Sequence, residues 1–329
     1  MFKLLSLIVI TLFFSTSMDA QRIAPSDLKS LKKKEDSLKN LSKSLIIDSL
    51  TAQRMRNDSL FIRTLVRSLQ VKNSFYYPFD SVQGVSKIYA PDSTFRIFTW
   101  SLSYDDYYSR QRGAIQYRTK DGSLKLVALR DFSEFTAKPN DSVRSKDNWI
   151  GAVYYNIIKT QHNGKNYYTL FGFDNNSVRT TKKWIEVLTF NDKDQPVFGG
   201  PMFIFDKDSP KKAPLHRFHI EYKKEASTLV NYVPDEGLIL VDHLISETDE
   251  DDKPYTFIPD GDYEGFKWQN GKWVHVNKVF NFKVDMKGVD PLLGNAPGDE
   301  PLIGKDGKRN EERLIEQSEK NKVKKKGKD

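Results

Sequence analysis

Asp260, Asp262 and Glu264 are the residues whose types and spacing come nearest to a metal site. Their carboxylates stand at alternate positions and a glycine follows in the sixth, as at the start of a calcium-binding loop. The twelfth position of such a loop holds a bidentate glutamate, but here it is Gly271, so further ligands would have to come from the acidic run 249–252. The alternative interpretation is a polar turn in which aspartate and glycine serve the backbone geometry. Calcium is the one cofactor that the sequence suggests.

His216, His219 and Glu221 form a second group with ligand-type side chains. They fall in a segment with the composition of a β-strand, where successive side chains point to opposite faces. His216 would then face away from the other two residues. The spacing also lacks the i, i+4 helical geometry of a zinc site. We therefore expect no metal here.

Paired carboxylates are the third chemistry to consider, because two acids about 5–9 Å apart in a cleft can hydrolyse a glycosidic bond. The acidic candidates are Asp105, Asp106, Glu186, Glu221 and Asp242. The chain contains neither a G-x-S-x-G nucleophile motif nor a glycine-rich phosphate loop. No catalytic residue is therefore assigned, and a glycan or peptide hydrolase is kept as the alternative function.

The elements that would position these residues are mostly strands. From Phe75 to about Val284 the chain runs in short aromatic and β-branched segments separated by turn residues. The dipeptides at 121–122, 163–164 and 270–271 are Asp-Gly or Asn-Gly, which favour two-residue hairpins. We predict an antiparallel meander over residues 74–285, arranged as a sandwich, a barrel or an irregular propeller-like fold.

A long amphipathic helix is predicted before the strands, within a basic arm of residues 21–73. Its leucines recur at spacings of three, seven, three and four residues, at Leu28, Leu31, Leu38, Leu41 and Leu45. The segment is long for one globular helix, so we expect a break near 48–54 or 57–58. The helix either packs on the β core or self-associates as a short coiled coil.

Several stretches of the β region resemble a group of uncharacterised exported, β-rich proteins of the Bacteroidota. They are residues 76–81, 91–92, 95–100, 168–174, 186–190 and 196–199. The resemblance covers roughly residues 75–280 and implies export and an all-β core. It implies no activity and no catalytic residues.

Residues 1–20 are predicted to be a cleavable signal peptide. Lys3 precedes an apolar run from Leu4 to Phe14, and the expected cut follows Ala20. That run is shorter than the ~20 residues that span a bilayer, and no later segment is apolar for as long, so no transmembrane segment is expected after cleavage. The chain has no cysteine, so the fold forms without disulfides. We predict an exported protein, periplasmic or extracellular.

The positive charge of the chain lies at its two ends. Residues 22–72 hold twelve Lys and Arg against five Asp and Glu, whereas the overall net charge is +8. Residues 286–329 begin with glycines and prolines and end in a lysine run, which predicts a linker and a largely disordered basic tail. Because the protein is expected to be exported, we predict no nucleic-acid partner. An anionic envelope surface or another envelope protein fits the basic arm better, although such charge also serves simply to solvate an exposed helix.

Together these patterns favour a non-enzymatic exported envelope protein. Its β domain would be an interaction module, and the basic helix would hold that module near an anionic surface or a partner.

Overall fold

The computed structural model describes residues 23–105, 107–205, 213–277 and 279. Two helices precede three sheets whose strands pair almost entirely antiparallel, so the predicted mostly β fold is confirmed. The predicted signal peptide and the 286–329 tail lie outside the described residues.

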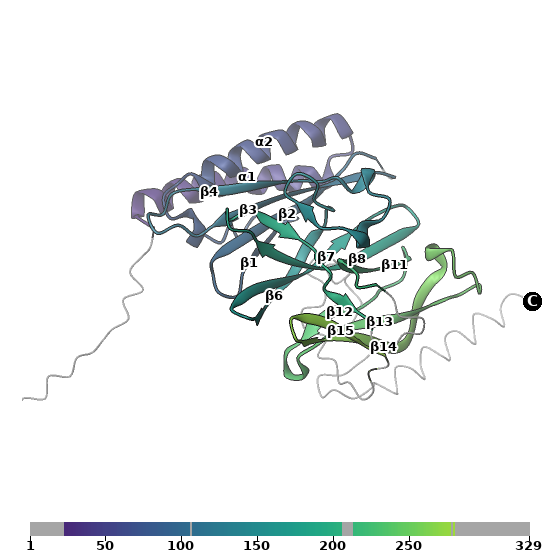
Figure 1. Ribbon diagram of the computed structural model, residues 1–329. Helices are drawn as coiled ribbons and strands as arrows, with labels where there is room; N and C mark the ends of the chain where they lie inside the picture. The colour runs from purple at the N-terminus through teal and green to yellow at the C-terminus, as the bar shows by residue number, and fades with distance from the viewer. Residues whose placement is uncertain (1–22, 106, 206–212, 278, 280–329) are drawn as a thin grey trace, which may run out of the picture.

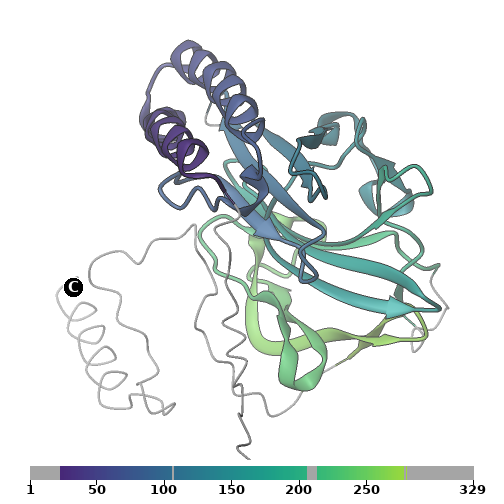
Figure 2. The ribbon, with the colours of Figure 1, turned by 90° about the vertical axis from the view of Figure 1, so that its left-hand side faces the viewer.

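The predicted long helix is two helices, α1 (Pro25–Ile47) and α2 (Thr51–Leu69). The chain breaks at the first of the two expected places, because Asp48 and Leu50 both adopt extended backbone conformations. The three-residue connection turns α2 back along α1, and the two helices lie side by side (Figures 1 and 2). We call residues 25–69 the helical hairpin.

Within the described residues the strands β1 to β15 form three sheets (Figure 1). The first sheet has the order β1 (Ser86–Tyr89), β2 (Phe95–Ser103), β3 (Ser109–Tyr117), β4 (Lys125–Arg130). The middle sheet has the order β5 (Arg144–Ser145), β9 (Pro196–Phe198), β8 (Thr180–Phe190), β7 (Lys165–Asp174), β6 (Val153–His162), and β11 (Arg217–Lys223) also pairs with β8. The third sheet has the order β10 (Phe203–Ile204), β15 (Lys272–Val276), β14 (Phe257–Gln269), β13 (Leu238–Ser246), β12 (Val230–Val233), and β10 runs parallel to β15.

Two of the three predicted two-residue turns are present, whereas Asp121–Gly122 lies within the longer connection 118–124 between β3 and β4. Asn163 and Gly164 both have positive φ, as do Asn270 and Gly271. That geometry suits two-residue turns, whose twist matches that of the flanking strands. The first turn joins β6 to β7 and the second joins β14 to β15.

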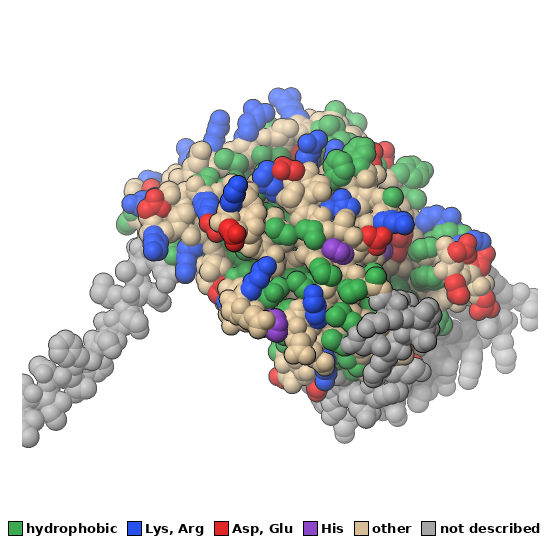
Figure 3. Space-filling model, viewed as in Figure 1, with side chains coloured by type: hydrophobic (Ala, Val, Ile, Leu, Met, Phe, Trp, Pro, Cys, Tyr) green, Lys and Arg blue, Asp and Glu red, His purple; other side chains and the backbone are tan. Residues whose placement is uncertain are grey.

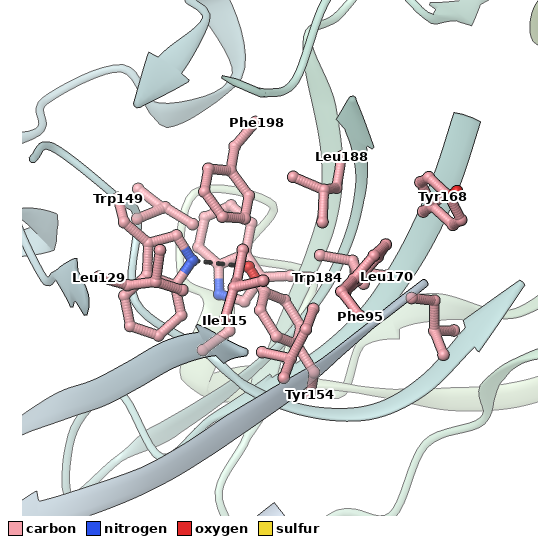
Figure 4. Packing of buried hydrophobic residues seen from close by; sticks show 14 of the residues in the cluster. Phe95, Ile115, Leu129, Trp149, Tyr154, Tyr168, Leu170, Trp184, Leu188 and Phe198 are labelled. Carbon is pink, nitrogen blue, oxygen red and sulfur yellow. Dashed lines mark hydrogen bonds between the residues drawn. The ribbon is translucent and has the colours of Figure 1, made fainter. Parts of the chain in front are cut away.

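The helices and sheets are stacked in layers, with one hydrophobic cluster at each interface. On β2 the side chains alternate, so that Phe98 and Trp100 pack against the hairpin while Phe95 and Ile97 face the middle sheet. The middle sheet alternates in the same way between the first and third sheets. Figure 4 shows the cluster between the first and middle sheets, where rings of Phe95, Tyr154, Trp184 and Phe198 gather.

The hairpin is therefore part of the core, which is the first of the two alternatives that its leucine pattern left open. It contributes Leu31, Leu38, Leu45, Phe61, Leu65 and Leu69 to the cluster that covers the first sheet. Self-association through a coiled coil stays a prediction.

A buried arginine fixes the segment that follows α2. Arg96 on β2 is fully buried, and its guanidinium donates to the backbone oxygens of Ser74 and Tyr77. The aromatic rings of Phe79, Tyr89 and Phe98 lie around the same cation, along with that of Phe75. Burial lowers the pKa of Arg96 to about 10, so it stays charged at neutral pH. The segment 74–79 is thereby tied to the first sheet.

Candidate surface-binding site

The outward face of the helical hairpin carries almost only positive charge. Eight of its cationic side chains are exposed: Lys29, Lys32, Lys33, Lys39, Lys43, Arg56, Arg63 and Arg67. Asp36 is the one exposed acid of the two helices. Within the part of the chain that the structure describes, none of the eight cations forms an ion pair.

The acids of the hairpin are turned toward the protein instead. Asp58 is buried and accepts hydrogen bonds from Trp100 Nε1 at 2.9 Å and from Arg112 Nε at 3.0 Å. Glu35 accepts from the hydroxyl of Tyr77 and from the backbone N–H of Ser81. Burial opposes ionisation of Glu35, but these hydrogen bonds outweigh it and hold the pKa of Glu35 below its usual value.

This separation of charge follows from the helical repeat. In α1 the residues that face the sheet, such as Leu31 and Leu38, lie on the side of the helix opposite to Lys29 and Lys43. Asp58 adds hydrogen bonds to the apolar contact between the hairpin and the first sheet, while eight of the hairpin cations are exposed to solvent. The result is a hairpin surface on which exposed cations outnumber exposed acids.

The end of the hairpin adds exposed apolar side chains to this surface. Ile46, Ile47 and Leu50 are 62%, 63% and 71% exposed, respectively, where α1 turns into α2. Figure 3 shows Lys and Arg side chains along the upper edge of the molecule, over the helices, and hydrophobic side chains toward the end where the helices turn. We call residues 46–50 the apolar tip.

The predicted calcium ligands lie on a strand and not in a loop. All three belong to β14, where alternate residues share a face. Asp260 lies 2.8 Å from Nδ1 of His243, and Glu264 lies 2.7 Å from Nε2 of His275. Among the described residues no group of three or more His, Asp or Glu side chains is arranged to hold a metal ion. The calcium hypothesis therefore does not enter the proposed function.

The members of the second histidine group have different partners in the structure. His219 stacks on Trp184 of β8, with ring centroids 4.5 Å apart, and Glu221 lies 3.2 Å from Lys182 Nζ. Burial lowers the pKa of His219 to about 4, which keeps its ring neutral. His216 precedes β11 and donates its backbone N–H to a carbonyl of the 139–141 segment.

The carboxylates considered for hydrolysis that the structure describes have separate partners. Asp105 accepts the backbone N–H groups of its own turn, and Asp242 accepts that of Leu229 at 2.5 Å. Burial raises the pKa of Asp242 to about 6. Asp106 lies outside the described residues.

Glu186 belongs to a buried polar network that the sequence did not indicate. Its carboxylate is 3.1 Å from Nε of Arg217 and accepts the hydroxyl proton of Tyr154, which itself accepts from Trp149 Nε1 (Figure 4). All four side chains are fully buried. Arg217 also donates to the carbonyls of Pro139 and Ser142. The network is satisfied within the protein, so its role is structural.

Within the described residues no helix is long and apolar enough to cross a membrane. Comparison with protein-family models, with curated proteins and with solved structures found no match to this chain.

Proposed function

We propose that this chain is a non-enzymatic exported envelope protein that holds its β domain, an interaction module, at an anionic surface through the helical hairpin. The observation that supports it is the charge of the hairpin, with eight exposed cations against one exposed acid. Lysine and arginine near an anionic membrane surface each contribute about 1 kcal/mol of attraction. Several together are enough for reversible attachment.

Two acids of the hairpin support the proposal, because their partners inside the protein keep them from neutralising these cations. Asp58 and Glu35 are engaged by the first sheet and its neighbouring segment. The charge of the outward face is therefore uncompensated in the folded protein, and it would be compensated by an anionic partner.

The test compares two variants with the same change of net charge. One carries Lys39→Gln, Lys43→Gln and Arg56→Gln on the hairpin. The other carries Lys120→Gln, Lys165→Gln and Lys193→Gln, which are exposed lysines on the β region. Deletion of the hairpin is unsuitable, since it would uncover the Phe98 and Trp100 face of the first sheet.

Binding is measured by co-sedimentation with vesicles of phosphatidylglycerol mixed into phosphatidylcholine, and with isolated envelope fractions. We expect the hairpin variant to bind about 100-fold more weakly and the β-region variant to bind like the unaltered chain. Raising the salt from ~0.05 to ~0.2 M should weaken binding of the unaltered chain. Equal binding by the two variants would show that the hairpin charge is not responsible.

A further inference from the structure

The exposed apolar side chains of the helical hairpin are concentrated at one end. Its exposed large hydrophobic residues are Ile46, Ile47, Leu50, Met55 and Leu60. They fall within a short stretch that includes the turn between the helices. The opposite end of the hairpin differs, since Ile23 before α1 and Leu69 at the end of α2 are buried.

Part of the backbone of the apolar tip is hydrogen-bonded inside the protein. Arg54 of α2 reaches back and donates from Nη1 to the carbonyl oxygens of Asp48, at 2.7 Å, and Ser49, at 3.0 Å. The Asp48 carboxylate accepts a hydrogen bond from Asn57 Nδ2 at 2.8 Å. The backbone N–H of Asp48 donates to the Ser44 carbonyl at 3.1 Å. Polar groups that have partners cost much less to remove from water than free ones.

The apolar tip thus combines outward hydrophobic side chains with the carbonyls of Asp48 and Ser49, which have a partner inside the protein. Lys43 and Arg56 are exposed on the helices next to it. Interfacial membrane segments have this composition, with apolar residues at the boundary of the acyl chains and cations at the level of the phosphates. A soluble polyanion would use the cations and leave the apolar residues in water.

We propose that the partner of this surface is an anionic lipid bilayer, into which Ile47 and Leu50 of the apolar tip insert. The inference rests on the proposed function and names its partner. Ile46 has a second role, because its side chain lies against Gly84, where an added Cβ would come within 2.6 Å of it. It is left unaltered in the test.

The first experiment uses the absence of cysteine from the chain. Leu50→Cys is labelled with an environment-sensitive nitrobenzoxadiazole group. The matched control is Ser37→Cys, an exposed position in the middle of α1. Vesicles containing phosphatidylglycerol should shift the emission of the label at position 50 to the blue and protect it from iodide. The label at position 37 should stay accessible to iodide.

The second experiment separates lipid from charge. Ile47→Ser with Leu50→Ser should weaken binding to phosphatidylglycerol vesicles about tenfold or more, because the apolar transfer is lost. Binding of the same variant to heparin, a soluble polyanion, should be unchanged.

The outcomes distinguish the two proposals. If the protein binds the vesicles but the label at position 50 stays as accessible to iodide as in solution, insertion is overturned and attachment by charge stands. If it binds heparin and not the vesicles, the bilayer is the wrong partner. If it binds neither, the proposed function itself fails.

Discussion

The helical hairpin and the contact between β8 and β11 both carry charged side chains, but they differ in whether the cations are buried or exposed. At the β8–β11 contact, Arg217 and Glu186 are both fully buried and paired with each other. In the hairpin, carboxylates such as Asp58 are turned inward and the cations are turned outward.

The difference separates a structural network from a binding surface. The opposite charges of Arg217 and Glu186 are paired with each other inside the protein, so neither is exposed to a partner. In the hairpin, Asp58 and Glu35 have partners inside the protein, whereas eight cations are exposed, so the field of these cations extends into the solvent. Buried charge should therefore govern the stability of the fold, and exposed charge should govern binding.

The largest expected effect is on the buried pair. Arg217→Met leaves the Glu186 carboxylate buried without its cation, which should cost about 3–5 kcal/mol of unfolding free energy. Urea unfolding measures it. The double variant Arg217→Met, Glu186→Met removes both charges and should lose clearly less. Equal losses in the single and double variants would show that the pair does not act as a unit.

The inner face of the hairpin should respond next. Asp58→Ala removes the acceptor for Trp100 Nε1 and for Arg112 and should destabilise the protein by about 2–3 kcal/mol. Arg63→Gln on the outward face of the same helix is the matched control and should stay within about 0.5 kcal/mol. Similar losses in both variants would contradict the division between the two faces.

Asp242 extends the comparison to a buried acid whose hydrogen-bond donor is a backbone N–H. Burial raises its pKa to about 6, an effect that nearby Lys183 opposes and Asp260 reinforces. Its stabilising contribution is present below the unfolded pKa, near 3.8, and is lost as the pH rises through about 6. Asp242→Asn should therefore gain on the order of 1–2 kcal/mol relative to the unaltered chain between pH 4 and pH 7. Parallel stability curves for the two proteins would refute this.

The smallest effect on stability is expected for a single outward cation. Lys33→Gln should leave the urea midpoint unchanged and weaken binding to anionic vesicles about fivefold. A variant that lost stability and kept its affinity would reverse the roles assigned to the two kinds of charge.

Features determined by neighbouring residues were predictable from the sequence. Asn163–Gly164 and Asn270–Gly271 form the expected turns because these residues tolerate positive φ. The leucine spacing of the hairpin predicted its buried face, and the break fell within an expected range. The positive net charge of the arm follows directly from its residue types.

Features that depend on distant residues were not predictable. Arg217 meets a carboxylate 31 residues away, and no local pattern indicates that pairing. The inward orientation of Asp58 depends on Trp100 and Arg112, which lie on two strands of the first sheet. The alternating acids of 260–264 match a calcium loop in sequence, but an extended strand produces the same alternation, and histidines from two neighbouring strands engage two of the acids.

The stacking order of the layers has a consequence for how the chain folds. Apart from β10 and β11, the layers follow one another in space as they do along the chain: hairpin, first sheet, middle sheet, third sheet. A chain that folds from its N-terminus can thus complete each layer against one that already exists. At every stage a single apolar face is left uncovered, and the next segment to emerge is the one that covers it.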